Sequence, residues 1–264
     1  MEQTTPAGPS LEADLALAHE LADAADGISL DRFLAPDLAV STKQDHTHVT
    51  DADRQVESTV RSMLSRHRPD DSILGEEEGG ALEGRTWVVD PIDGTANYLR
   101  GVPVWATLIG LVVDDAVPLG LVSAPALGRR WWASAGAGAW TRFAGAPPRR
   151  CRVSQVTRVS EAFVSYASLK GWDSVPQSIA PLLEATWRTR GYGDFWSYML
   201  LAEGAVDVAT EPELALHDMV ALAAIVMESG GRFTDLTGSP GPFGPNALAS
   251  NGLLHDEVLR LLTG

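Results

Sequence analysis

The segment WVVDPIDGTAN, residues 87–97, places two carboxylates at the point where the chain leaves an apolar run. Asp90 and Asp93 stand three residues apart, directly before Gly94 and Thr95. Two carboxylates that lie close together repel each other, and each raises the pKa of the other. A divalent cation is the simplest partner that would compensate both charges. The segment therefore predicts a cation site at the end of a buried strand.

The composition indicates a globular protein with an acidic surface. The chain has 264 residues, of which 45% are hydrophobic and 21% are charged, and its formal net charge is −15. This length is enough for one large domain or two modest ones. An acidic surface repels nucleic acid and anionic lipid, so we expect neither as a partner. An anionic substrate would need bound cations that reverse the local field.

Cysteine use and the lack of membrane signals favour a cytoplasmic protein. The single cysteine, Cys151, excludes an intrachain disulfide framework and fits a reducing compartment. The first ten residues contain neither the basic nor the apolar region of a secretory signal. No apolar run approaches the roughly 18 residues that a membrane span requires.

The hydrophobic spacing differs between the two halves of the chain. Residues 11–34 and the stretch that begins near Thr50 have helical spacing, and Thr50 with Asp53 resembles a capping pair at the second helix start. Apolar strands follow between about residues 72 and 140. This pattern predicts an α+β first half with a mainly antiparallel or mixed sheet. A junction rich in Pro and Arg follows, and beyond it helices and strands alternate, as in α/β proteins. We therefore predict two domains, residues 1–150 and 151–264.

Further acids lie where a core would exclude them. Asp53 shares a helical face with Val56, and Asp218 shares one with Leu222, so both acids point toward the buried side. The helix dipole alone also favours an acid at a helix start. The acidic run 76–78 follows an apolar strand, and taken alone it would fit a solvated turn. Taken together, these acids favour a metal site over separate structural roles.

The types of side chain in this set select the metal and the chemistry. Carboxylate oxygens without clustered His or Cys indicate Mg²⁺ rather than zinc. Two Mg²⁺ ions that share carboxylates would activate a water molecule and stabilise the oxyanion that leaves phosphorus. Gly94 and Thr95 can offer backbone N–H groups and a hydroxyl to a phosphate at a helix start.

These motifs resemble those of the inositol monophosphatase superfamily, whose members are Mg²⁺-dependent, lithium-sensitive phosphomonoesterases. The resemblance covers residues from about 11 to 264, and its most specific motif is DPIDGT. Within the superfamily, the chain is most similar to histidinol-phosphate phosphatases of the actinobacterial type. The motifs are DPIDGT (90–95), GEE (75–77), VTDAD (49–53) and HD (217–218), with RGVPVWATLIGL (100–111), VSAPALGRRWW (122–132), GYGDFWSY (191–198), AEGAVDVATEP (202–212) and ASNGLLHDEVL (249–259) for the subgroup.

The resemblance implies a five-layered αβαβα sandwich and a phosphatase in histidine biosynthesis. The implied reaction is hydrolysis of L-histidinol phosphate to L-histidinol and phosphate. It also implies a homodimer, for which the neighbouring Trp131 and Trp132 would supply aromatic surface. The same two tryptophans would alternatively fit a core strand.

The resemblance also assigns metal ligands. It implies that Glu76, Asp90 and the carbonyl of Ile92 hold one Mg²⁺, and that Asp90, Asp93 and Asp218 hold a second. A third, looser ion would involve Glu76, with Asp45 as a further contributor.

The remaining site residues are also carried over from the resemblance. Asp53 and Thr95, together with Glu76, are the expected catalytic residues, because Asp53 and Thr95 would orient and deprotonate the attacking water. The backbone amides of Gly94 and Thr95 would bind the phosphate. Asp194 and Glu211, with Asp45, are the expected contacts to the substrate, and acids suit a cationic amine or imidazole better than a neutral polyol. The structural alternatives are a helix N-cap for Asp194 and a surface turn for Glu211.

Three departures from the family pattern leave the substrate open. His217 stands where the family usually has Trp, His48 where it has Pro, and Ala96 where close relatives often have a basic residue. None of the three removes a metal ligand. The alternatives are inositol phosphate and a sugar or aminocyclitol phosphate of specialised metabolism; a nucleotide-type bisphosphate fits the excess of acid less well. A non-enzymatic metal-binding regulator would not need the pair of Asp53 and Thr95.

Overall fold

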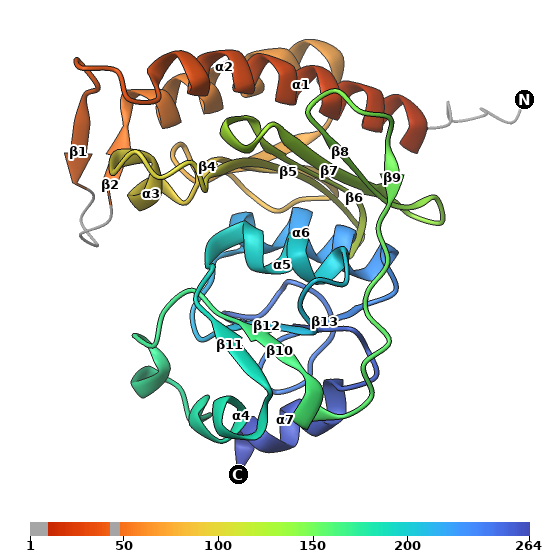
Figure 1. Cartoon of the computed structure of the whole chain (residues 1–264). Helices are drawn as coiled ribbons and strands as arrows, with labels where there is room; N and C mark the ends of the chain where they lie inside the picture. The colour runs from red at the N-terminus through yellow and green to blue at the C-terminus, as the bar shows by residue number, and fades with distance from the viewer. Residues whose placement is uncertain (1–9, 43–47) are drawn as a thin grey trace, which may run out of the picture.

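The computed structural model describes residues 10–42 and 48–264. Its helices are α1 (Leu11–Arg32), α2 (Asp51–His67), α3 (Thr95–Leu99), α4 (Ala180–Ala185), α5 (Asp194–Ala202), α6 (Leu216–Glu228) and α7 (His255–Thr263), with short 3-10 turns η1 (Pro125–Leu127), η2 (Val159–Glu161) and η3 (Trp172–Ser174). The chain forms five stacked layers (Figure 1): α1 and α2, a seven-stranded sheet, α5 and α6, a five-stranded sheet, and α4 with α7. The αβαβα sandwich is thus confirmed.

The larger sheet contains the strands of the first half. They are β3 (Ser72–Gly75), β4 (Arg85–Asp93), β5 (Ala106–Val113), β6 (Ala116–Ala124), β7 (Arg129–Ser134), β8 (Gly138–Phe143) and β9 (Arg149–Arg150), in that order across the sheet. Strand β3 pairs with β4 in parallel, and the other neighbours are antiparallel. The sheet is therefore mixed and mainly antiparallel, as the sequence predicts.

The smaller sheet belongs to the second half. Its strands are β10 (Phe163–Ser165), β11 (Arg188–Arg190), β12 (Val208–Glu211), β13 (Arg232–Thr234) and β14 (Ala247–Ser250). In a separate two-stranded sheet, β1 (Val40–Thr42) pairs antiparallel with β2 (His48–Thr50). The order across the smaller sheet is β11-β10-β12-β14-β13. Strand β10 is parallel to both of its neighbours, and the other pairs are antiparallel.

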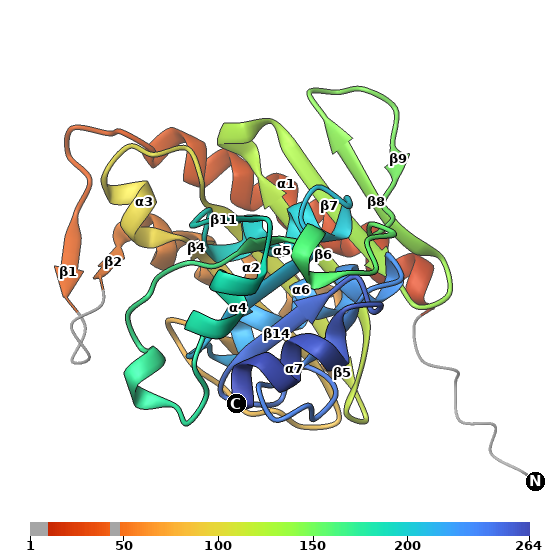
Figure 2. The same ribbon diagram turned by 60° about the horizontal axis from the view of Figure 1, so that its bottom comes forward.

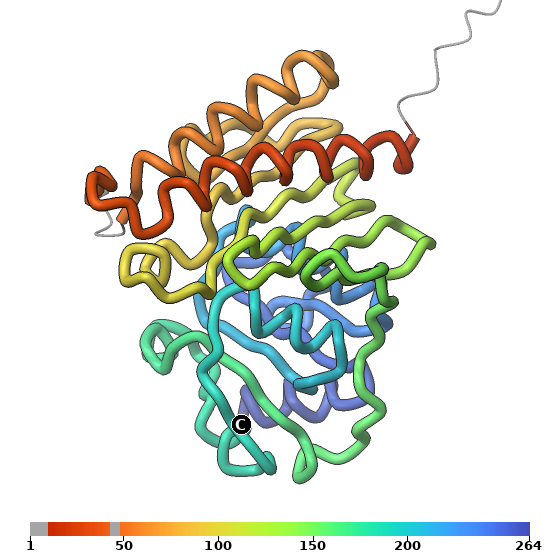
Figure 3. The backbone as a smooth tube through the Cα atoms, turned by 45° about the horizontal axis from the view of Figure 1, so that its top comes forward, coloured from red at the N-terminus to blue at the C-terminus, as the bar shows by residue number. Residues whose placement is uncertain are grey.

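Helices α1 and α2 lie side by side over the outer face of the larger sheet (Figure 3). Helix α2 begins at a capping box, because the Thr50 hydroxyl accepts from the N–H of Asp53 and the Asp53 carboxylate accepts from the N–H of Thr50. Val56, Val60 and Leu64 then recur at helical spacing and pack into the core beneath. The capping pair that the sequence predicts at this helix start is therefore present.

The middle layer depends on close contact between α6 and the larger sheet. Helix α6 is apolar on all sides after its first turn, which is typical of a helix buried between two sheets. Gly110 of β5 and Gly120 of β6 pair directly and face α6. A Cβ at Gly110 would lie 2.4 Å from Val220 Cγ1, and one at Gly120 would lie 2.4 Å from the Ala221 carbonyl oxygen. The two glycines therefore allow the helix to approach the sheet.

Helices α4 and α7 cover the far face of the smaller sheet and lie toward the viewer in Figure 2. Leu182 of α4 and Val258 and Leu262 of α7 are buried against Val164 of β10 and Leu248 of β14. This cluster is separate from the two clusters that line the larger sheet.

The tryptophan pair does not form an aromatic surface. Trp131 is fully buried in the middle layer and donates its indole N–H to Glu203 at 2.5 Å. Trp132 points to the opposite face of the strand, where it packs on the outer core and meets His19 edge to face. Strand alternation separates the two rings. The expectation of dimer surface is therefore wrong for Trp131, which the core alternative describes, and it stays a prediction for the partly buried Trp132.

The division into residues 1–150 and 151–264 stays a prediction. Strand β9 ends at Arg150 and no strand starts again before Phe163, which agrees with a junction there. However, α5 and α6 of the second half share one core cluster with β5, β6 and β7 of the first half. The two halves therefore bury apolar surface jointly through the middle layer.

Replacing Gly120 with Ala should lower the free energy of unfolding by about 1–3 kcal/mol, because the new methyl group meets backbone atoms of α6 that cannot rotate away. The matched control is Gly27→Ala in α1, where a Cβ meets nothing within 4 Å. That change should raise stability by about 0.5–1 kcal/mol. Urea unfolding measures both. Equal effects of the two changes would contradict the close contact at Gly120.

Candidate active site

A bulge in β4 brings Asp90 and Asp93 to the same side of the sheet. In a regular strand, residues three apart point to opposite faces. Asp90 pairs with Leu108 of β5 but Asp93 pairs with Ala106, so β4 holds one more residue than its partner between these two points. The extra residue reverses the alternation after Asp90. The two aspartates can therefore share one site.

A third carboxylate comes from the start of α6. One carboxylate oxygen from each of Asp90, Asp93 and Asp218 lies within 4.8 Å of the other two. Asp218 Oδ2 accepts the N–H of Ala215, which leads into the helix, at 2.7 Å. Asp93 is likewise held by the N–H of Phe195 in α5, at 2.8 Å. Backbone groups of α5 and α6 thus orient two of the three acids.

The electrostatics of this cluster favour a bound cation. Burial, followed by the charges of Glu76, Asp93 and Asp218, raises the pKa of Asp90 well above its ordinary value. The Asp90 side chain is 1% exposed, and among the described residues its Oδ1 has no hydrogen-bond partner. A buried oxygen without a donor is costly unless a positive group meets it. The donor set of hard oxygens fits Mg²⁺.

Glu76 lies beside this cluster on the turn that follows β3. After burial, its charge is the next largest cause that raises the pKa of Asp90. The backbone N–H of Glu76 donates to the carbonyl of Val89 at 3.1 Å, which ties the turn to β4 one residue before Asp90. Glu76 therefore lies next to the cluster, whereas Glu78 of the same acidic run is exposed.

Asp53 and Thr95 face each other at the edge of the cluster. Asp53 is fully buried, and burial is the main cause that raises its pKa. Its Oδ2 accepts from the N–H and the hydroxyl of Thr50, whereas its Oδ1 lies 3.5 Å from the Thr95 hydroxyl. That hydroxyl also lies 3.0 Å from the carbonyl of Ile92. The helix cap thus occupies one oxygen of Asp53 and leaves the other directed at Thr95.

Gly94 forms the turn between β4 and α3. The turn places this residue in the left-handed conformation, with φ at 83°, which glycine adopts without strain. A Cβ there would lie 3.0 Å from the carbonyl oxygen of Val104 and 3.3 Å from a carboxylate oxygen of Asp194. Asn97 donates from its amide nitrogen to both of these oxygens at 2.9 Å. Asn97, which was not among the predicted site residues, therefore joins the turn at Gly94 to Asp194. Its position inside the 87–97 segment was the available signal.

Asp194 and Glu211 form a second acidic pair next to the cluster. Asp194 is the first residue of α5, and its carboxylate accepts from Asn97 rather than capping the helix. Burial and then the charge of Asp218 raise the pKa of Asp194 to about 6. Burial, Asp194 and Asp218 raise the pKa of Glu211 well above its ordinary value. Glu211 is only 7% exposed at the end of β12, so the surface-turn alternative is wrong.

Tyr198 is a neighbour of this pair that the sequence argument did not single out. The ring is buried in α5, and after burial the charge of Glu211 contributes to raising the pKa of its hydroxyl. Among the described residues, neither this hydroxyl nor Glu211 Oε1 has a hydrogen-bond partner. Tyr198 lies four residues after Asp194, so both project from the same face of α5. That spacing was a signal that Tyr198 belongs to the site.

The remaining positions that the sequence analysis named are Asp45, His48, Ala96 and His217. Asp45 lies outside the described residues. His48 and Ala96 are exposed, on β2 and α3 respectively. His217 lies at the start of α6, with its Nε2 3.5 Å from a carboxylate oxygen of Asp218. Of the three departures from the family pattern, His217 is the one in contact with a carboxylate of the cluster.

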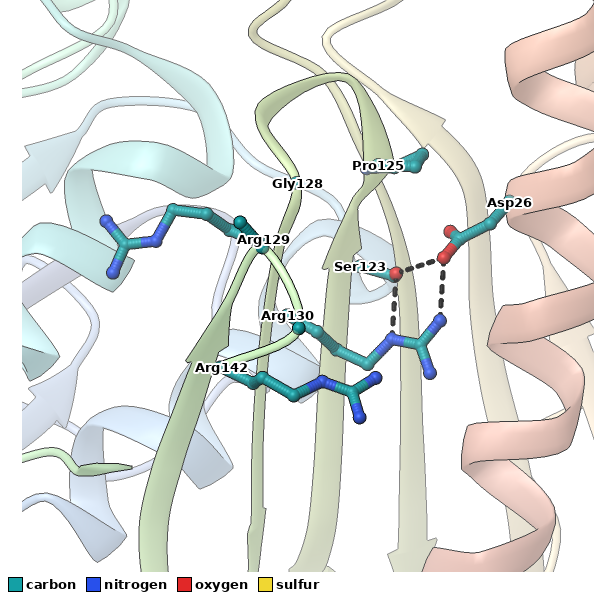
Figure 4. Close-up of a pocket in the computed structure, with 9 residues that line it drawn as sticks. Asp26, Ser123, Pro125, Gly128, Arg129, Arg130 and Arg142 are labelled. Atoms are coloured by element: carbon teal, nitrogen blue, oxygen red, sulfur yellow. Dashed lines mark hydrogen bonds and ion pairs between the residues drawn. The ribbon is translucent and has the colours of Figure 1, made fainter. Parts of the chain in front are cut away.

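A hollow of about 250 Å³ over β6 and β7 contains Arg129, Arg130 and Arg142 but shares no residue with the carboxylate cluster. Figure 4 shows the Arg130 guanidinium bonded to Asp26 of α1 and to Ser123 of β6. Arg129 points away and pairs with Glu203. These arginines mainly join elements of the fold, so they do not identify a phosphate site.

Comparison with known proteins identifies the class. Residues 10–262 match the inositol monophosphatase family, and the chain belongs to that family. The structure of Thermotoga maritima IMPase superposes with a TM-score of 0.82 at 30% identity, covering 95% of this chain and 96% of that one. The suhB protein of Bartonella henselae superposes with a TM-score of 0.84 at 27% identity, covering 94% and 98%.

Two curated relatives are more similar in sequence. The histidinol-phosphatase of Mycobacterium tuberculosis is 54% identical over 253 residues, which cover 94% of this chain and 97% of the relative. The histidinol-phosphatase of Streptomyces coelicolor is 55% identical over 256 residues, which cover 94% and 96%. The resemblance drawn from the motifs is confirmed. The chain is a phosphomonoesterase, so the alternative of a non-enzymatic regulator falls away. Among the described residues, the helices are too short or too polar to span a membrane.

Replacing Asp93 with Asn should stabilise the metal-free protein at pH 7.5. Burial, followed by the charges of Asp194 and Asp218, raises the pKa of Asp93 well above 3.8 in the folded state. Such a group contributes stability at low pH, and this contribution is lost as the pH rises from 3.8 toward the folded-state pKa. Asn keeps an oxygen for the N–H of Phe195 and removes only the charge.

Thermal unfolding with a chelator present measures the effect. We expect the variant to unfold a few degrees higher at pH 7.5, since about 1 kcal/mol moves the midpoint by about 2–4 °C at this size. The difference should shrink near pH 4. Added Mg²⁺ should stabilise the unmodified protein more than the variant. A variant less stable than the unmodified protein at pH 7.5 without metal would contradict repulsion within the cluster.

Proposed function

We propose that this phosphomonoesterase hydrolyses L-histidinol phosphate to L-histidinol and phosphate, in histidine biosynthesis. The observation that carries the proposal is the buried pair of Asp194 and Glu211 beside the carboxylate cluster. An ammonium or imidazolium group would relieve the repulsion between these acids, whereas a neutral polyol would not. The two relatives above 50% identity, both called histidinol-phosphatase, support the same substrate.

We assign Mg²⁺ to the carboxylate cluster. Glu76, Asp90 and the carbonyl of Ile92 would hold one ion, and Asp90, Asp93 and Asp218 a second. A third, looser ion would involve Glu76 and Asp45. Bound Mg²⁺ would supply positive charge against the phosphate ester and its leaving oxygen. The unpartnered Oδ1 of Asp90 supports this assignment.

The catalytic roles follow from which oxygens are already occupied. Asp53 Oδ2 is held by Thr50, so Oδ1 is the atom that would accept a proton, directly or through the Thr95 hydroxyl 3.5 Å away. Water held by this pair would be oriented for attack on phosphorus. The N–H groups of Gly94 and Thr95 would bind the phosphate oxygens, and the left-handed turn at Gly94 supports this role.

Inositol phosphate is the second candidate substrate. The overlap with Thermotoga maritima IMPase at 30% identity supports the same chemistry on a neutral polyol phosphate. A sugar or aminocyclitol phosphate would require the same cluster, and an aminocyclitol would also satisfy the acidic pair.

Cytoplasmic location and a homodimer are also proposals. The buried thiol of Cys151 fits a reducing compartment. With Trp131 in the core and Trp132 partly buried, further aromatic surface for a dimer would have to come from elsewhere, for example Trp187, which is 66% exposed. Light scattering at micromolar concentration distinguishes a dimer from a monomer.

Phosphate release from a panel of esters tests the proposal directly. The panel contains L-histidinol phosphate, inositol phosphate, a sugar phosphate and nitrophenyl phosphate, each with Mg²⁺ and with a chelator. We expect L-histidinol phosphate to have the highest kcat/KM and turnover to require Mg²⁺. Asp93→Asn should lower turnover of every ester at least ~10²-fold, about 2.7 kcal/mol of barrier. Faster turnover of inositol phosphate would replace the proposed substrate but keep the chemistry.

Replacing Glu211 with Gln should weaken the use of L-histidinol phosphate mainly through KM. The amide keeps the size of the side chain but removes the charge that would face the amine, and this contact exists in the ground and transition states alike. We expect about a tenfold rise in KM, or about 1.4 kcal/mol. Nitrophenyl phosphate, which has no cationic group, is the control and should be almost unaffected. Unchanged kinetics with L-histidinol phosphate would remove the main structural support for this substrate.

A further inference from the structure

Glu57 is a buried acid of α2 that lies outside the predicted catalytic and ligand sets. It follows Asp53 by four residues, so both carboxylates project from the same face of the helix. Glu57 is 0% exposed, although a charged side chain is almost never fully buried without partners. The nature of its partners therefore indicates its role.

The carboxylate of Glu57 binds the backbone of the turn that carries Glu76. Its Oε2 accepts the N–H of Glu77 at 2.7 Å, and its Oε1 accepts the N–H of Glu78 at 3.0 Å. A Cβ at Gly75 would lie 2.0 Å from Oε1, so the carboxylate also occupies the space beside the residue before Glu76. Glu57 thus contacts the chain on both sides of Glu76.

Arg61, one further turn along α2, completes this attachment. Its Nε donates to Glu57 Oε1 at 2.9 Å, and its Nη2 donates to the carbonyl of Gly79 at the end of the turn. The arginine therefore compensates the buried charge of Glu57 and holds the far end of the same turn. Two residues of one helix face bind the segment from Gly75 to Gly79.

Helix α2 positions two parts of the candidate site. The same helix that directs Asp53 toward Thr95 also fixes the turn that presents Glu76 to Asp90. We propose that Glu57 and Arg61 are positioning residues that hold Glu76 at the cation site and thereby set the affinity for the metal. Neither touches the reacting atoms. The inference rests on the proposed Mg²⁺ site, whose outer supports commonly change metal affinity by about 10- to 100-fold.

Glu57→Gln is the most direct test. Glu77 and Glu78 donate to different oxygens of Glu57, and in the amide one of these two atoms becomes an NH₂ donor that faces an N–H group, while the size is unchanged. Titration of the full metal-free chain with Mn²⁺, followed by the EPR signal of free Mn²⁺, measures binding without any turnover. We expect binding about 10- to 100-fold weaker. Activity on nitrophenyl phosphate should recover toward that of the unmodified protein as Mg²⁺ is raised, because the ligands themselves remain.

Three comparisons separate positioning from general damage. Glu203→Gln breaks a comparable buried contact with Arg129 and Trp131 elsewhere in the fold, and it should leave Mn²⁺ affinity unchanged. Arg61→Gln should shift the affinity in the same direction as Glu57→Gln, and it keeps the test open if the first variant does not fold. Asp93→Asn should bind Mn²⁺ more weakly, and raising Mg²⁺ should not restore its activity on nitrophenyl phosphate.

The outcomes are distinguishable. If Glu57→Gln and Arg61→Gln bind Mn²⁺ as tightly as the unmodified protein, the positioning role is overturned and the proposed function stands. An equal loss of Mn²⁺ affinity in Glu203→Gln would also overturn the positioning role, since the loss would then reflect general stability. If the unmodified protein itself binds no Mn²⁺, the proposed metal site fails and this inference fails with it.

Discussion

Repulsion among buried carboxylates is the constraint on which the rest of this structure depends. The fold gives three of these acids a backbone N–H for one of their oxygens: Thr50 for Asp53, Phe195 for Asp93 and Ala215 for Asp218. The other oxygen is then available to a cation or a water molecule. The three donors belong to three elements, so a site of this kind requires the layers to be assembled before it can form.

The spacing of the layers follows from the same requirement. The start of α6 places Asp218 next to the bulge of β4. Val220 and Ala221, which touch the sheet, follow Asp218 within one turn of the helix. The paired glycines of β5 and β6 permit this close approach. A bulkier pair would move the helix outward and carry Asp218 away from Asp90. Packing in the middle layer therefore also sets the geometry of the cluster.

Much of the site could be read from local pattern, because each acid sits at a recognisable place in its own element. Asp53 and Asp218 each occupy the third position of a helix. At this position an acid can stabilise the helix start and also belong to the carboxylate site. Glu57 was within reach of the same argument, since it lies one turn after Asp53. It was missed because a sequence does not show that its partners are backbone groups of a distant turn.

The sequence by itself determined the helices and strands, the capping box at Thr50, the acidic set and the family, because periodicity and motif spacing are local properties. Only the tertiary structure decided which of these acids meet, that Trp131 is buried within the middle layer, and that Glu211 is buried rather than exposed. It also decided that α5 and α6 serve both sheets. These outcomes depend on contacts between residues far apart in the chain, and strand alternation, the bulge in β4 and the distance between layers set those contacts.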